Sequence, residues 1–110
     1  MTDNEGVLEI GNKEEFEEFI SDGIVLVDFF ADWCMPCLMM APVIDDLSET
    51  FEGKIKFAKV NIDDNSDIAR KFHVSSIPNF VVFKDGEPIE QFVGAISSEE
   101  FENKLNKLIE

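Results

Sequence analysis

The only two cysteines of the 110-residue chain, Cys34 and Cys37, are separated by Met35 and Pro36. Such a pair can exchange disulfides, because one thiolate attacks and a second thiol nearby resolves the mixed disulfide. A helix N-terminus lowers the pKa of a thiol, since its backbone N–H groups lack partners and its dipole is positive. Pro36 has a fixed φ that suits a first helical turn. We therefore expect an exposed, activated Cys34 and a deeper Cys37.

Two other interpretations of the cysteine pair stay open. A Cys-x-x-Cys can be half of a zinc site, but His73 is the only other thiol or imidazole in the chain, so a closed site would need carboxylates or a second copy of the chain. The pair can also be buried and inert, although a strand before it and a helix after it favour activation. We interpret His73 as an end-of-helix residue and expect no metal site.

Asp28 interrupts an otherwise apolar segment, residues 24–30. A carboxyl group in this segment should be buried, and burial raises its pKa towards that of a proton-transfer group. The alternative is an aspartate at a strand end that faces water. Lys59 lies in register with Ile55 and Phe57, so it can share their inward face and approach Asp28. A solvated lysine at the sheet edge is the alternative.

The apolar pattern predicts five strands and four helices that must position these residues. The expected strands are residues 7–10, 24–30, 55–62, 80–83 and 89–93, and the expected helices are 13–21, one from the first cysteine to about 51, 65–72 and one after Ser97. Capping boxes at Asn12 and Ser97 start two helices, Asn65 is a candidate cap for the third, and Pro42 should kink the long one. The order β-α-β-α-β-α-β-β-α predicts an α/β fold, with a parallel sheet between helices that is closed by an antiparallel hairpin at Asp85-Gly86.

The size and charge of the chain limit its class. One domain over residues 1–110 is expected, with residues 1–6 as a loose N-terminal segment. The chain has 24 acids and 9 bases, so it should repel nucleic acid and anionic lipid. The N-terminus lacks the basic start and apolar stretch of a signal peptide, and no apolar run approaches the ~20 residues of a membrane span. We expect a cytoplasmic protein, where a close cysteine pair is more often catalytic than structural.

Several separated segments, in the same order, resemble the thioredoxin family from about Phe16 to the C-terminus. They are residues 27–37 (VDFFADWCMPC), Ala41-Pro42, 59–63 (KVNID), Ile77-Pro78, 83–86 (FKDG) and Val93-Gly94. The resemblance implies the thioredoxin fold, with one central mixed sheet of about five strands and about four helices. It also implies a protein disulfide oxidoreductase that reduces disulfides of target proteins. A thioredoxin reductase would supply the electrons, and the protein would be a monomer without a cofactor.

The resemblance also implies roles for single residues. Cys34 would be the nucleophile and Cys37 the resolving thiol. Asp28 would help to move the proton of Cys37, and Lys59 would modulate it. The residues that would contact the substrate are Trp33, Met35, Pro36, Ile77, Pro78 and Gly94. An X-Pro bond is by itself expected to be trans, but the resemblance implies a cis bond between Ile77 and Pro78.

The chain departs from the family pattern at four positions near the cysteines. Met35 stands where Gly is usual, Leu38 where Lys is frequent, Phe30 where Trp is common and Asn79 where Thr follows the proline. Because residues between the cysteines help to set the reduction potential, Met35 makes a disulfide oxidant or isomerase a second hypothesis. A non-catalytic binding module is a third. Met35, Leu38 and Met39 would form an apolar, adaptable rim that shifts partner choice.

Overall fold

The computed structural model describes residues 6–110, so all but Gly6 of the expected loose segment lies outside the described residues. The strands are β1 (Val7–Ile10), β2 (Ile24–Phe30), β3 (Lys56–Asn61), β4 (Asn79–Lys84) and β5 (Glu87–Val93). The helices are α1 (Lys13–Ile20), α2 (Met35–Thr50), α3 (Ser66–Lys71) and α4 (Ser98–Ile109). The predicted element order is confirmed, and the predicted bounds are close to the observed ones.

The five strands form one mixed sheet in the order β1-β3-β2-β4-β5. β1 and β2 each run parallel to β3, whereas β4 runs antiparallel to β2 and β5 antiparallel to β4. The predicted parallel sheet with an antiparallel hairpin is therefore confirmed. The hairpin turn has positive φ values, 50° at Asp85 and 91° at Gly86, which suit a tight two-residue connection. The pattern had not indicated that the hairpin joins the sheet beside β2.

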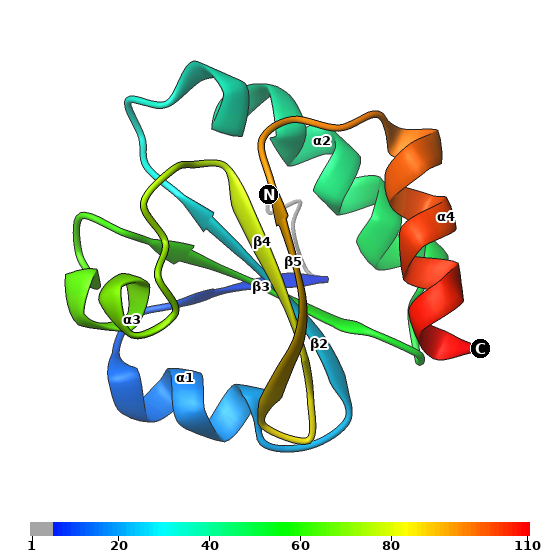
Figure 1. Cartoon of the computed structure of the whole chain (residues 1–110), viewed down its shortest axis with the longest axis horizontal. Helices are drawn as coiled ribbons and strands as arrows, with labels where there is room; N and C mark the ends of the chain where they lie inside the picture. The colour runs from blue at the N-terminus through cyan, green and yellow to red at the C-terminus, as the bar shows by residue number, and fades with distance from the viewer. Residues whose placement is uncertain (1–5) are drawn as a thin grey trace.

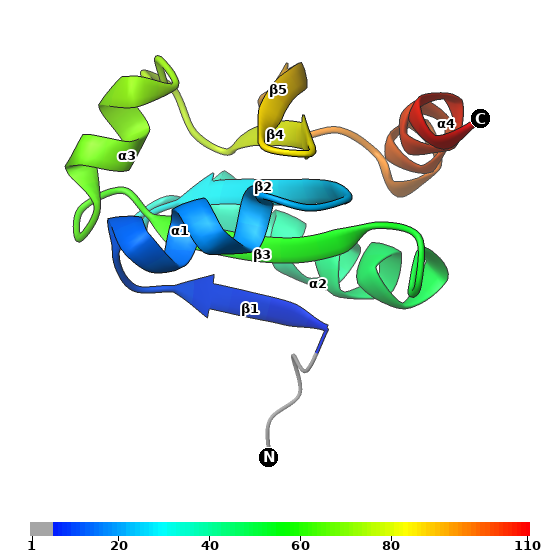
Figure 2. The same cartoon turned by 90° about the horizontal axis from the view of Figure 1, so that it is seen from below.

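Helices cover both faces of the sheet, with α2 and α4 on one side and α1 and α3 on the other (Figures 1 and 2). Side chains alternate between the two faces along each strand. Leu26 of β2 packs in the cluster that contains Met40 of α2, and Val25 and Val27 pack in the cluster that contains Phe16 of α1. β2 is therefore buried on both faces, which explains its almost unbroken apolar sequence.

Two local features differ from their predictions or add to them. Asn65 occupies the N-cap position of α3, but its side chain makes no capping hydrogen bond. Instead its Nδ2 donates to the carbonyl of Asn61, the last residue of β3, at 3.2 Å, and Asn65 is buried. Pro42 lies inside α2, as predicted. No helix within residues 6–110 is long and apolar enough to cross a membrane.

Candidate active site

The cysteine pair lies where the central strand passes into the long helix. β2 ends at Phe30, a turn follows in which the Cys34 amide donates to the Ala31 carbonyl at 3.2 Å, and α2 begins at Met35. Cys34 is the N-cap of α2, with the extended φ and ψ of −94° and 105°. Cys34 and Cys37 are joined by a disulfide, and their Cα atoms are 5.3 Å apart. The turn after β2 thus places the cysteine pair at the N-terminus of α2.

Both cysteines are buried in this disulfide form, each only 5% exposed. The expectation of an exposed Cys34 above a deeper Cys37 is therefore wrong for the oxidised chain. The disulfide holds the two residues together in one small cluster with Ala31. Phe30, Ile62 and Ile77 pack against that cluster, and these neighbours come from the ends of β2 and β3 and from the loop before β4. The cluster therefore joins three separate segments of the chain around the disulfide.

The helix start is arranged to stabilise negative charge on sulfur. The Cys37 amide donates to the Cys34 Sγ at 3.2 Å, so the sulfur takes the position of a capping oxygen. The first turn of α2 contains no acid. A hydrogen bond to the charged form and an uncompensated positive helix end both favour thiolate over thiol. The geometry is therefore that of an activated attacking thiol once the disulfide is reduced.

Asp28 is the buried carboxyl group of the region, 6% exposed. It lies two residues after Leu26 and therefore on the sheet face that packs against α2. Burial raises the pKa of Asp28 to about 7, and the positive charge of Lys59 lowers that pKa in part. Its Oδ1 atom has no hydrogen-bond partner among the described residues. A carboxyl group with a pKa near neutrality can take up and release a proton under ordinary conditions.

Lys59 is placed beside Asp28, as the register argument had suggested. The two residues are direct partners in the parallel β2–β3 pair, and Phe80 faces Asp28 from β4 on the other side. Lys59 is half-buried, and its Nζ lies 5.6 Å from the centre of the Phe30 ring. The positive charge of Lys59 offsets only part of the effect of burial on the pKa of Asp28.

The loop before β4 brings a proline to the cysteine pair. The Ile77–Pro78 bond is cis, so the expectation from the resemblance is confirmed and the general expectation of a trans bond is wrong. Ile77 packs against the cysteine cluster. The Gly94 amide donates to the Pro78 carbonyl at 2.8 Å, and Gly94 has a φ of 95°, which favours glycine. The structure thus brings together Ile77, Pro78 and Gly94, three of the predicted contact residues.

Exposed apolar side chains lie along one side of the start of α2. Met35, Leu38 and Met39 are each more than half exposed, and their spacing places them on one side of the helix. We call these three residues the apolar rim. Trp33 is 67% exposed, and its indole Nε1 donates to the Asp63 Oδ2 at 2.9 Å. The exposed apolar side chains thus come from residues next to the buried disulfide in the chain.

Two residues near the site are not among those that the sequence predicts to be functional. One is Asp63, which accepts the hydrogen bond of the Trp33 indole and belongs to the segment 59–63. Asn79, noted only as a departure from the family, is 2% exposed and hydrogen-bonded on both sides. A buried polar residue directly after the proline was the available signal for Asn79. His73 follows α3 with a φ of 60°, consistent with its interpretation as an end-of-helix residue.

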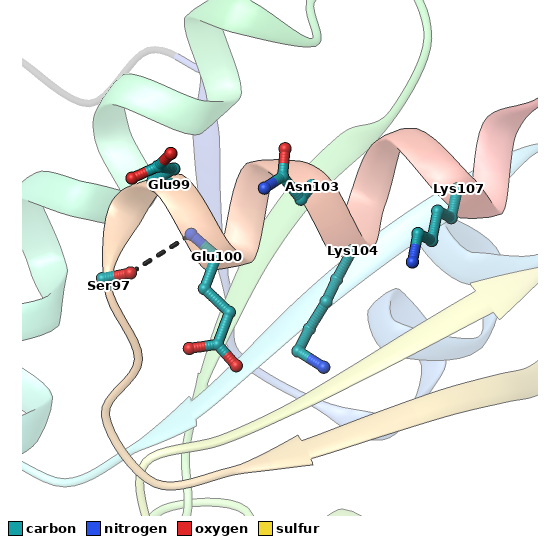
Figure 3. A pocket seen from close by; sticks show the side chains of 6 residues that line it. All are labelled: Ser97, Glu99, Glu100, Asn103, Lys104 and Lys107. Atoms are coloured by element: carbon teal, nitrogen blue, oxygen red, sulfur yellow. Dashed lines mark hydrogen bonds between the residues drawn. The ribbon is translucent and has the colours of Figure 1, made fainter.

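Three surface hollows within residues 6–110, one along α4, one between α1 and α3 and one beside β5, have no cysteine in their linings. The one in Figure 3 is a groove of about 320 Å³ along α4, lined by Ser97, Glu99, Glu100, Asn103, Lys104 and Lys107. At one end of the groove, the Glu100 amide donates to the Ser97 Oγ at 3.1 Å and so caps α4. Within residues 6–110, no group of three or more His, Cys, Asp or Glu side chains is arranged to hold a metal ion.

Comparison with known proteins points to one family. The family model for thioredoxin matches residues 7–107. The chain is 46% identical to the thioredoxin of Staphylococcus haemolyticus over 92 residues, which cover 84% of this chain and 88% of that relative. The thioredoxin of Staphylococcus aureus is 42% identical over 93 residues, or 84% and 89% of the two chains. A solved mutant thioredoxin from Halobacterium salinarum superposes with a TM-score of 0.87 at 30% identity, and covers 100% of this chain and 96% of that one.

Proposed function

The chain belongs to the thioredoxin family and is a thiol–disulfide oxidoreductase, and from this premise we propose that it reduces the disulfides of target proteins. The observation that carries the proposal is the hydrogen bond from the Cys37 amide to the Cys34 Sγ at the first turn of α2. It marks Cys34 as the thiol whose anion the helix stabilises. Cys34 is therefore the nucleophile, and Cys37, one turn on, is the resolving thiol.

The reaction is two successive disulfide exchanges. The Cys34 thiolate attacks one sulfur of the target disulfide, the target S–S bond breaks, and the other target sulfur leaves as a thiolate. Cys37 then loses its proton and attacks the Cys34 Sγ, which breaks the mixed disulfide and releases the second target thiolate. Two electrons pass to the target, and the chain ends as the Cys34–Cys37 disulfide of the structure.

Asp28 is the group that we assign to the proton of Cys37. Its burial and its pKa of about 7 support this assignment, because a base works best when its pKa is close to the working pH. Lys59, the partner of Asp28 across the β2–β3 pair, favours the ionised carboxylate and so tunes the pH at which the base is available.

On this proposal, the target docks over the groups around the disulfide, of which Trp33, Met35 and Pro36 are exposed and Pro78 is buried. The contact residues are Trp33, Met35, Pro36, Ile77, Pro78 and Gly94. Trp33 and Met35 are each more than 60% exposed, and Ile77 packs against the cysteine cluster. An apolar surface around a reactive sulfur suits a partly unfolded or exposed segment of a target protein.

Membership of the thioredoxin family supports a proposal for the partners and the cellular location of the protein. We assign the electron supply to a thioredoxin reductase, the substrates to disulfide-containing proteins, and the working form to a cytoplasmic monomer with one domain over residues 1–110. The excess of 24 acids over 9 bases supports the absence of a nucleic-acid partner.

Replacement of each cysteine tests the assignment of roles. Cys34→Ser should abolish turnover of a protein disulfide, because no attacking thiolate remains. Cys37→Ser should still attack but should accumulate mixed disulfides, detected by mass spectrometry and released by dithiothreitol. Sustained turnover by Cys37→Ser would contradict the two-thiol mechanism.

The reduction potential of the Cys34–Cys37 couple tests the direction of the reaction. Equilibration with a dithiothreitol or glutathione series should give a value near the about −270 mV that is characteristic of thioredoxin. A value between roughly −180 and −120 mV, the range of oxidising relatives, would instead make the protein a disulfide oxidant or isomerase. Met35 is the residue that would then account for the difference, and Met35→Gly is the variant to measure.

A further inference from the structure

Asn79 lies between the cis-proline loop and the edge strand β5. It is the first residue of β4, directly after Pro78, and is 2% exposed. Its Nδ2 donates to the Ser76 carbonyl at 3.2 Å, and its Oδ1 accepts from the Gln91 Nε2 at 2.9 Å. One buried amide thus joins the backbone of the loop to a side chain of β5.

The loop held by Asn79 is the one that reaches the cysteine pair. The Ser76 carbonyl immediately precedes Ile77, and Ile77 packs against the Cys34–Cys37 cluster. The same loop is tied to the end of β5 by the 2.8 Å hydrogen bond from the Gly94 amide to the Pro78 carbonyl. That second tie is between backbone atoms, whereas the two bonds of the Asn79 side chain, to Ser76 and to Gln91, can be removed by side-chain replacement.

We propose that Asn79 and Gln91 form an amide bridge that positions the Ile77–Pro78 loop against the cysteine pair and thereby sets the affinity for protein disulfides. Both are positioning residues, because they act through the loop and touch no reacting atom. The inference rests on the proposed function, since it assumes that the substrate docks beside Ile77. A small disulfide that does not use the loop should be indifferent to the bridge.

The amide bridge has a fixed direction. The Ser76 carbonyl can only accept a hydrogen bond, so the Nδ2 of Asn79 must face it and the Oδ1 must face β5. Residue 91 must therefore donate. Glutamine can donate, whereas glutamate has nearly the same shape and at neutral pH only accepts. With glutamate at this position, Asn79 either faces a second acceptor with its Oδ1 or turns its Nδ2 away from the loop.

Gln91→Glu is accordingly the variant that tests the bridge. Gln91 is exposed on an edge strand, so its replacement should leave the fold intact. With dithiothreitol as electron donor, we expect the KM for a protein disulfide to rise about three- to tenfold, as for the loss of one hydrogen bond, while kcat stays within about twofold. The second-order rate with dithiobis(nitrobenzoate), a small disulfide, should be unchanged.

Two further variants separate the bridge from charge and from stability. Gln91→Lys restores a donor and should keep the KM close to that of the wild type. Asn103→Asp adds the same negative charge as Gln91→Glu on an exposed residue of α4 and should leave the KM unchanged. If Asn103→Asp raises the KM equally, the effect is one of charge and the bridge is refuted.

The outcomes distinguish this inference from the proposed function. An unchanged KM in Gln91→Glu, with a wild type that reduces the same protein disulfide, overturns the positioning role and leaves the function standing. A lower melting temperature with an unchanged KM assigns the bridge to stability alone and also overturns it. If the wild type fails to reduce protein disulfides and Cys37→Ser traps no target, the proposed function fails first.

Discussion

Helices α1 and α4 begin at polar N-caps that are followed by acids, whereas α2 begins at a cysteine and has no acid in its first turn. In α1 the Asn12 side chain accepts from the Glu15 amide at 2.8 Å, and in α4 the Ser97 side chain accepts from the Glu100 amide at 3.1 Å. In α2 the acceptor is the Cys34 Sγ. The same capping hydrogen bond, from the amide three residues on, is therefore accepted by oxygen in α1 and α4 and by sulfur in α2.

The difference shows that the chain has acidic residues at helix starts that only need stability and none at the helix start that carries the cysteines. A carboxylate in the first turn stabilises a helix by about 0.3–1 kcal/mol through the helix dipole, and α1 and α4 each have two. A chain with 24 acids that leaves the first turn of α2 without one keeps its positive end uncompensated. That end is available to the thiolate of Cys34.

The largest expected effect is on the free energy of unfolding and comes from replacement of Asp28, the buried carboxyl group of β2. Its pKa is about 7 in the folded chain against 3.8 for an ordinary aspartate, so folding disfavours its ionised form. Stability should fall as the pH rises from about 4 to about 7, because in this window only the unfolded chain has lost the proton. Asp28→Asn should then raise the free energy of unfolding at pH 8 by up to about 4 kcal/mol, from roughly three pKa units at ~1.4 kcal/mol each.

Denaturant unfolding at pH 4 and pH 8 measures this effect, and the gain should vanish at pH 4, where wild-type Asp28 is already neutral. Asp46→Asn, at an exposed position of α2, is the matched control and should show no such gain. Asp28→Asn should also slow the resolving step by about tenfold or more, since a positioned base contributes at least that much, and should remove a pH inflection near 7 from the rate. An equal gain at both pH values would show that Asp28 is not protonated by burial.

The next largest effect is on stability, and it distinguishes the N-caps of α1 and α4 from the reactive N-cap of α2. Asn12→Ala and Ser97→Ala each remove a capping oxygen and should lower the free energy of unfolding by about 1 kcal/mol. For a chain of this length, that corresponds to a melting temperature lower by about 4 °C. Disulfide reduction should be unaffected below the new melting temperature. A loss of activity in either variant would show that the starts of α1 and α4 also contribute to the chemistry.

The sequence predicted the elements well, because most of them are defined by local pattern. β2 was predicted with its observed bounds, since a strand buried on both faces is an unbroken apolar run that only Asp28 interrupts. The starts of α1 and α4 were predicted because Asn12 and Ser97 cap within three residues of their partners. Local spacing likewise indicated that Asp28 is buried.

Contacts between segments far apart in the chain could not be predicted from the local sequence pattern. The equal burial of Cys34 and Cys37 depends on Ile62 and Ile77, which come from other elements. The bonds from Trp33 to Asp63 and from Gln91 to Asn79 join side chains 30 and 12 residues apart, and no periodicity links them. The cis bond at Pro78 was expected from family resemblance and not from the residues themselves.

The smallest expected effect tests whether the absence of acidic residues from the first turn of α2 stabilises the Cys34 thiolate. Met35 and Ser98 are the first residues of α2 and α4, and both are exposed. Met35→Glu should raise the pKa of the reduced Cys34 thiol, because the new carboxylate opposes the developing thiolate. The shift should be about half a unit, since a charge at a helix end is worth about 0.3–1 kcal/mol.

Ser98→Glu is the matched control, because it places the same charge at the first position of α4, a helix that carries no reactive cysteine. It should leave the Cys34 pKa unchanged, and neither variant should lower the melting temperature, as both add a favourable charge to a helix start. The pKa is measured from the pH dependence of alkylation of the reduced protein by iodoacetamide. If Met35→Glu leaves that profile in place, the dipole of α2 does not set the reactivity of Cys34, and the lack of acid at its start has no chemical consequence.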